Sequence, residues 1–204
     1  MRVIGMLDSP YVRRVAISLR LMGLPFEHKP LSVFRDFEAF ASINRAVKAP
    51  TLVTDDGTVL LDSTLILDYL DRIAPAERRL TPITPEAFLK SQRLIGLALA
   101  ACEKSVQIVY ETNLRPAEKQ HQPWLDRVER QLLASYDLLE AGFDGADGWR
   151  VGGRAMQADV TAAVAWRFTQ GVLPGKVAEI RYPALSALSR NAEATAAFIA
   201  FPPD

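Results

Sequence analysis

The sequence predicts an α/β domain over residues 1–80 and an all-α domain over residues 86–204. Three observations support this division. Strand-like and helix-like patterns alternate through the first eighty residues, as they do in α/β folds. Residues 74–85 contain three prolines around a charged stretch, which is typical of a linker. Beyond it, strand signals nearly vanish and helical periodicity dominates.

The first domain is expected to contain a four-stranded mixed sheet with helices packed on it. Short apolar runs predict the strands, and apolar positions three and four residues apart predict the helices. Asp55-Asp56-Gly57-Thr58 is a hairpin signal, because Gly57 can adopt a positive φ. The expected elements, in order, are a strand over 3–7, a helix from Pro10 that Gly23 ends, a strand over 26–33, a helix over 37–43, strands over 51–53 and 59–61, and a helix from Ser63.

The second domain carries apolar stripes at helical spacing. Leu94, Ala98 and Ala101 form one stripe, and a longer one runs from Leu125 to Leu139. A third helix is expected over residues 159–170. Cys102 falls in the first of these helices, where a small buried apolar residue is the simplest interpretation of a lone cysteine.

Composition and charge narrow the classes of function. Hydrophobic residues make up 49% of the 204 residues, enough for a buried core. Lys plus Arg and Asp plus Glu both number 24, and this zero balance argues against nucleic acid or an anionic membrane surface as the main partner. No apolar run reaches the roughly 18 residues of a membrane span, and the first residues do not resemble a secretory signal. With a single cysteine, these features predict a cytoplasmic protein without disulfides.

No metal site is expected. Clusters of His and Cys at short spacing are the usual sign of a zinc site. His28 and His121 lie far apart in sequence, and neither has a His or Cys at such spacing.

Ser9-Pro10 stands where the first predicted strand gives way to a helix. Serine is a favoured N-cap and proline a favoured first helical residue. The unpaired N–H groups and partial positive charge of a helix start favour an anion, and a serine hydroxyl can donate a hydrogen bond to a thiolate. Lowering a thiol pKa from about 8.5 by two units requires roughly 2.7 kcal/mol. One charge-assisted hydrogen bond plus a helix terminus is of that size.

Two downstream fragments contain groups that could bind the rest of a thiol-containing ligand. Pro50 pushes Ala49 to an extended backbone, so the N–H and C=O of Ala49 could pair with a peptide backbone. Lys48 could meet a carboxylate. Asp62-Ser63 starts the next helix, where N–H groups and a hydroxyl could hold an α-carboxylate while Asp62 meets an ammonium group. In this order, the fragments outline a pocket for a small anionic thiol peptide.

Each fragment also has a simpler explanation. Ser9-Pro10 and Asp62-Ser63 are good helix starts without any ligand. The Pro50 segment can be an ordinary loop, and Lys48 a solvated surface lysine.

In combination, these residues resemble the glutathione S-transferase family. The matching motifs are Ser9-Pro10-Tyr11-Val12-Arg13-Arg14, Ala49-Pro50-Thr51 and Asp62-Ser63. The family architecture, a thioredoxin-like N-terminal domain and a helical C-terminal domain, fits nearly the whole chain. The Ser-Pro-aromatic start is similar to that of tau-class and YibF-type bacterial members. Ala49 departs from the valine that usually precedes the proline.

The resemblance implies a role for each matching residue. Ser9 would be catalytic and would stabilise the thiolate of glutathione. The backbone of Ala49 would pair with the cysteinyl unit, and Lys48 would lie near the glycyl carboxylate. Asp62 and Ser63 would bind the γ-glutamyl end.

The implied activity is attack of the glutathione thiolate on a hydrophobic electrophile or a peroxide, in a homodimer without a metal. Tyr11 and Tyr110 are candidates for the second-substrate pocket. A serine at position 9 cannot form the mixed disulfide of thiol–disulfide exchange. The alternatives are a glutathione- or ligand-binding protein with little turnover, an interaction module on the same fold, and isomerisation of the maleylacetoacetate type. The Ser-rich start typical of that isomerase class is missing.

Two further sequence features, one in the first helix and one in the second domain, predict local structure. Arg13, Arg14 and Arg20 form a basic strip on the first helix, interpreted as a solvated face or a face toward a dimer partner. Family members often carry Ser/Thr-x-x-Asp at the start of a core helix, and here Met156 replaces the hydroxyl while Asp159 remains. The loss of one such cap costs about 1 kcal/mol.

Overall fold

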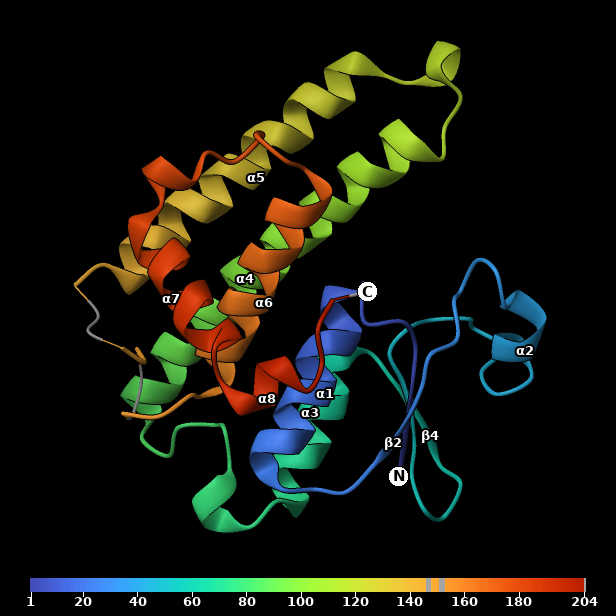
Figure 1. The fold of residues 1–204 in the computed structure, drawn as a ribbon, viewed down its shortest axis with the longest axis vertical. Coiled ribbons are helices and arrows are strands. Elements are labelled where there is room, and N and C mark those ends of the chain that lie inside the picture. The colour runs from blue at the N-terminus through green and yellow to red at the C-terminus, as the bar shows by residue number, and fades with distance from the viewer. Residues whose placement is uncertain (146–147, 151–152, 204) are drawn as a thin grey trace. The chain divides into compact units, whose positions relative to one another are not determined.

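The computed structural model describes residues 1–145, 148–150 and 153–203, which form two compact units (Figure 1). The first unit contains Met1–Thr81 and the C-terminal segment from Ala194 onward. The second unit is Pro82–Glu193. The predicted fold class, an α/β part followed by a mostly helical part, is confirmed.

The first unit is built on a four-stranded mixed sheet. Its strands follow the order β2-β1-β3-β4, with β1 parallel to β2 and the other neighbours antiparallel. Their bounds are β1 (Arg2–Ile4), β2 (Glu27–Lys29), β3 (Thr51–Val53) and β4 (Val59–Leu61). The first two are shorter than predicted. Gly5, with a φ of 138°, ends β1. After β2, the N–H of Leu31 donates a hydrogen bond to the carbonyl of Lys29, and this tight turn ends the strand.

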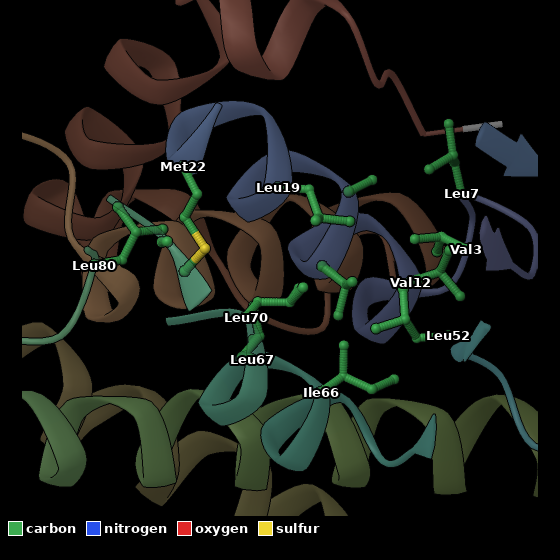
Figure 2. Close-up of a cluster of buried hydrophobic side chains, with 13 residues drawn as sticks. Val3, Leu7, Val12, Leu19, Met22, Leu52, Ile66, Leu67, Leu70 and Leu80 are labelled. Carbon is green, nitrogen blue, oxygen red and sulfur yellow. The ribbon is translucent and has the colours of Figure 1, made fainter. Parts of the chain in front are cut away.

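The sheet has a different core on each face. Successive side chains of a strand point to opposite faces, so Val3 and Leu52 lie on one face while Ile4 and Val53 lie on the other. Helices α1 (Pro10–Met22) and α3 (Ser63–Ile73) cover the first face, where Figure 2 shows their apolar side chains around Val3 and Leu52. Phe40 of α2 (Phe37–Ala41) packs on the second face.

The interpretation of the arginine strip as a solvated face is wrong for two of its three members. Arg13 and Arg14 are each only 2% exposed, whereas Arg20 lies at the surface. Ten of the thirteen residues of α1 are buried, so this helix does not have the single apolar stripe that its periodicity predicts. The Nε of Arg13 donates to the carbonyl of Phe201, and Nη2 of Arg14 donates to the hydroxyl of Thr64.

The ends of the first unit differ from the predicted domain limits. Residues 86–204 were expected to form the helical domain, but the segment from Ala194 belongs to the first unit because its aromatic side chains pack there. Phe201 lies 5.6 Å from Phe26, ring centre to ring centre. Part of the predicted linker is also held to the first unit, because the carboxylate of Asp71 accepts the N–H groups of Leu80 and Thr81. The short helices here are η1 (Ala76–Arg78) and α8 (Ala196–Ile199).

The elements in the described part of the second unit are α4 (Pro85–Asn113), η2 (Ala117–Lys119), α5 (Gln122–Phe143), α6 (Gln157–Val172), η3 (Glu179–Arg181) and α7 (Pro183–Glu193). Helices α5 and α6 pack against α4, and α7 packs against α6 and α5. A buried chain of hydroxyl groups joins three of them, because Tyr136 and Ser105 both lie within hydrogen-bond distance of Thr169. Cys102 is buried, as predicted.

Helix α6 starts at Gln157, two residues before its predicted start, and Asp159 organises this start. The fully buried Asp159 carboxylate accepts the N–H of Met156 at 3.0 Å and the N–H of Arg150 at 2.8 Å. The acidic half of a capping box is therefore present although the serine or threonine is replaced.

Candidate functional site

The strand register brings the three predicted fragments to one edge of the sheet. Ile4, at the end of β1, pairs with Thr51 at the start of β3, and Thr51 pairs with Leu61 at the end of β4. The segments that follow Ile4, precede Thr51 and follow Leu61 therefore lie side by side. These are the segments that carry Ser9, Lys48 to Pro50, and Asp62 to Ser63.

Ser9 caps α1 as expected. Its backbone is extended, Pro10 is the first helical residue, and its carbonyl accepts the N–H of Arg13 at 2.9 Å. The hydroxyl oxygen lies 3.4 Å from the N–H of Val12, a long and weak contact. Among the described residues, the Ser9 O–H has no acceptor. It is therefore available to donate to an anion beside the start of α1.

A close approach at Gly5 sets the spacing between the loop after β1 and the Ala49 segment. A Cβ atom at Gly5 would lie 2.6 Å from Cγ2 of Val12 and 3.0 Å from Cβ of Ala49. The carbonyl of Gly5 is held by the ring of His28, whose Nε2 is 2.8 Å away. Only glycine fits here, because both the φ of 138° and the contacts exclude a side chain.

Gly5→Ala is therefore expected to lower the free energy of unfolding by about 3 kcal/mol, from backbone strain plus overpacking. Gly57→Ala is the matched control: its φ is 86°, and a Cβ atom added there would have no other atom within 4 Å. It should cost only about 1 kcal/mol of backbone strain. Urea unfolding of both variants measures the difference, and equal losses would contradict the close approach at Gly5.

The Ala49-Pro50 bond is cis, and the turn before it is held by buried side chains. Thr51, which is fully buried, donates to the carbonyl of Lys48 and accepts from the amide of Asn44, both at 2.8 Å. Among the described residues, neither the N–H nor the C=O of Ala49 has a hydrogen-bond partner. Both groups are free to pair with a peptide, as the Ala49-Pro50 motif suggests.

Asp62 and Ser63 form the start of α3. Asp62 is the N-cap and its carboxylate accepts the N–H of Thr64 at 2.8 Å, while Ser63 is buried at the first helical position. Partial burial of Asp62 disfavours its charged form. The Thr64 N–H bond and the charges of Lys48 and Arg14 outweigh that effect and lower the pKa of Asp62 below its ordinary value. Asp62 is therefore a carboxylate at neutral pH.

Lys48 and Asp62 contact one another. The ammonium group of Lys48 lies 3.5 Å from Oδ2 of Asp62, and both side chains are about half exposed. The resemblance assigns these two residues to opposite ends of glutathione. Exposed pairs of this kind contribute at most about 1 kcal/mol, so a zwitterionic ligand can replace the contact at small cost.

Backbone strain is concentrated at the same edge. In the described part of the chain, the non-glycine residues with positive φ are Val47 at 46° and Asp62 at 67°. Such conformations are rare, and for a β-branched residue such as Val47 they are true outliers. Strained residues cluster at binding and catalytic sites because the surrounding structure must hold them.

Arg14 also lies at this site, although the sequence pattern does not indicate it. Its buried guanidinium lies 3.1 Å from the Thr64 hydroxyl and so joins α1 to the first turn of α3. Its charge is one of the causes that lower the pKa of Asp62. No signal in the helical pattern identifies Arg14, because an arginine outside the predicted apolar positions is expected at the surface.

The two predicted second-substrate residues belong to different units. Tyr11 is half-buried on α1, two residues after Ser9, and Tyr110 is 46% exposed on α4. Within the described residues, no group of three or more His, Cys, Asp or Glu side chains could hold a metal ion. In the same residues, no helix combines the length and the apolar character needed to cross a bilayer.

Comparison with known proteins identifies the family. Residues 3–78, which contain the whole site edge, match the family model of the glutathione S-transferase N-terminal domain. The GST-like protein YibF of Escherichia coli is 30% identical over 142 residues, covering 69% of this chain and 68% of YibF. The chain belongs to the glutathione S-transferase family. Maleylacetoacetate isomerase of Pseudomonas aeruginosa is 27% identical over 72% of this chain and 71% of that protein.

Solved structures of glutathione S-transferases resemble the whole chain. The enzyme from Methylobacterium radiotolerans, solved in complex with glutathione sulfonate, superposes with a TM-score of 0.90. It is 27% identical in sequence, and the match covers 99% of this chain and 94% of that one. The predicted glutathione S-transferase architecture is therefore confirmed.

Proposed function

We propose that this glutathione S-transferase family member activates the thiol of glutathione and transfers glutathione to a hydrophobic electrophile. The observation that carries the proposal is the common edge formed by Ser9, the Ala49-Pro50 turn and the Asp62–Ser63 helix start. A related structure, 27% identical, was solved with a glutathione derivative.

In this proposal, Ser9 is the catalytic residue. Its O–H donates to the thiolate sulfur, and the start of α1 adds positive potential. The thiol proton leaves to solvent. The sulfur then forms a bond to an electrophilic carbon while the leaving group departs with its electron pair. Alternatively, it attacks the hydroxyl oxygen of a hydroperoxide, and the O–O bond breaks to give glutathione sulfenic acid and an alkoxide that takes up a proton from solvent.

The remaining groups would bind the tripeptide. The N–H and C=O of Ala49 pair with the cysteinyl unit in the manner of an added strand. Asp62 meets the γ-glutamyl ammonium group, while Ser63 and the N–H groups of α3 hold the γ-glutamyl carboxylate. The ammonium group of Lys48 leaves Asp62 and pairs with the glycyl carboxylate instead. Tyr11, two residues after Ser9, would contact the electrophile.

The test is glutathione binding by calorimetry, followed by conjugation of an aryl chloride and reduction of an organic hydroperoxide. Binding with turnover is expected. Binding without turnover would favour the ligand-binding alternative. A protein that does not bind glutathione would contradict the proposal and leave an interaction module on the same fold.

A glutathione-dependent isomerase is the second candidate, favoured by the similarity to the isomerase of Pseudomonas aeruginosa. Addition of the thiolate to a conjugated cis double bond, rotation and release would return glutathione unchanged. A cis-to-trans isomerisation assay with maleylacetone separates the two reactions, because conjugation consumes glutathione and isomerisation does not.

We also propose a homodimer. Leu65 is 66% exposed on α3, and Val59 and Leu61 of the edge strand β4 are 38% and 37% exposed on the face of the sheet opposite α3. Exposed apolar side chains on both faces of this sheet edge favour a partner surface. Sedimentation should show a dimer that Leu65→Lys shifts toward monomer, whereas Ile180→Lys, at a residue 91% exposed in the second unit, should not. A monomeric wild type would contradict the proposal.

A further inference from the structure

The C-terminal segment, defined here as residues 194–203, packs against the helix that carries Ser9. It belongs to the first unit although more than a hundred residues of the second unit precede it. Helix α8 packs on α1, and Phe201 packs against Phe26 with ring centres 5.6 Å apart. These contacts bury Phe198 almost completely.

Arg13 is a buried charged residue of α1 that contacts the C-terminal segment. Its guanidinium is almost fully removed from water, so it requires partners inside the protein. Nε donates to the carbonyl of Phe201 at 2.8 Å, and the guanidinium carbon lies 5.5 Å from the ring centre of Phe198. A planar cation that both donates and stacks is specific to arginine.

The same residue also holds the start of α1 through its backbone. The N–H of Arg13 donates to the carbonyl of Ser9 at 2.9 Å, the first intrahelical bond of α1. The only bond to the Ser9 hydroxyl among the described residues is the weak 3.4 Å contact from Val12. The Ser9 side chain is therefore oriented by the backbone of the first turn, and Arg13 anchors that turn to the C-terminal segment.

We propose that Arg13 is a positioning residue that couples the C-terminal segment to the first turn of α1 and so holds Ser9 for thiol activation. The proposal rests on the proposed function of Ser9. Arg13 does not touch the thiol. It acts by fixing the position of the hydroxyl donor, since a hydrogen bond weakens steeply with misalignment.

The test compares Arg13→Met with Arg20→Met, a matched control on the exposed face of the same helix. We expect Arg13→Met to raise the pKa of the bound glutathione thiol by about one pH unit. Glutathione affinity should change less than threefold, because Ala49, Asp62 and Ser63 lie on other elements. Amide exchange at residues 13 and 14 should become about tenfold faster. Arg20→Met should change none of these quantities. Arg13→Lys should change the thiol pKa and the exchange less than Arg13→Met does.

Three outcomes would overturn the proposal. In the first, Arg13→Met leaves both the thiol pKa and the local exchange unchanged. In the second, exchange rises equally over the whole first unit, which indicates a structural role alone. In the third, Arg20→Met has the same effect as Arg13→Met. If Arg13→Met does not fold, Phe198→Leu removes only the ring face and should show the same pattern at smaller size.

The exchange measurement keeps this proposal separate from the proposed function. A wild type that binds glutathione without ionising its thiol would contradict the role of Ser9. Local exchange in Arg13→Met would then still decide whether the C-terminal segment holds the first turn of α1.

Discussion

Replacing Ser9 by alanine is expected to lower the rate of glutathione conjugation by up to about 25-fold at pH 7. If Ser9 and the start of α1 lower the thiol pKa from about 8.5 to about 6.5, the ionised fraction at pH 7 falls from about three quarters to about 3% when the whole shift is lost. Glutathione affinity should stay within about threefold, because the other contacts to the tripeptide remain. Steady-state kinetics and calorimetry measure the two effects separately.

The pH dependence makes this prediction specific. Near pH 9 an unassisted thiol is already mostly ionised, so the defect of Ser9→Ala should nearly disappear. Ser9→Thr keeps a hydroxyl at a position that accepts threonine as an N-cap, and it should retain most of the activity. A defect that stays constant from pH 7 to pH 9 would mean that Ser9 supports binding geometry rather than thiol ionisation.

Asp159→Ala is expected to lower the free energy of unfolding by about 3 kcal/mol. The carboxylate accepts the N–H groups of Arg150 and Met156 in a fully buried position, and alanine would leave both donors without an acceptor. Urea unfolding measures the loss. Asp144→Ala is the control, since Asp144 is exposed at the end of α5 and should change stability by less than about 0.5 kcal/mol. Similar losses in the two variants would contradict the role of Asp159.

Asp159 also predicts a pH dependence of stability. Burial is the main cause that raises the pKa of Asp159 above its ordinary value of 3.8, and the two N–H bonds oppose it. Between 3.8 and the raised value, the folded state keeps a proton that the unfolded state has released, so stability falls as pH rises through that window. Relative to Asp159→Asn, which does not titrate, the wild type should lose stability over this range. A relative gain would show that the N–H bonds dominate.

Local signals were sufficient for part of the fold. The bounds of β3 and β4 match the prediction, because Gly57 and the flanking apolar runs define that hairpin within a few residues. The strand over 3–7 was predicted too long, since apolar Met6 and Leu7 continue the pattern after Gly5 has turned the backbone. The C-terminal segment was assigned to the wrong domain, because helical periodicity does not reveal which core a helix joins.

The candidate site could be predicted at the residues whose type favours a particular backbone conformation. Ser9 and Asp62 are N-caps and Pro50 restricts its neighbour, so their segments could be found and ordered from the sequence. Contacts between distant segments could not. The bond from Arg14 to Thr64 and the ion pair of Lys48 with Asp62 depend on how the helix starts meet at the sheet edge.

Ionisation of bound glutathione by Ser9 can be measured by titrating the bound thiol and following thiolate absorbance in the ultraviolet. The experiment compares wild type with Ser9→Ala at saturating glutathione. We expect a wild-type thiol pKa about two pH units below that of free glutathione, and a return toward the free value in Ser9→Ala. A wild-type complex whose bound thiol titrates like free glutathione would contradict this expectation.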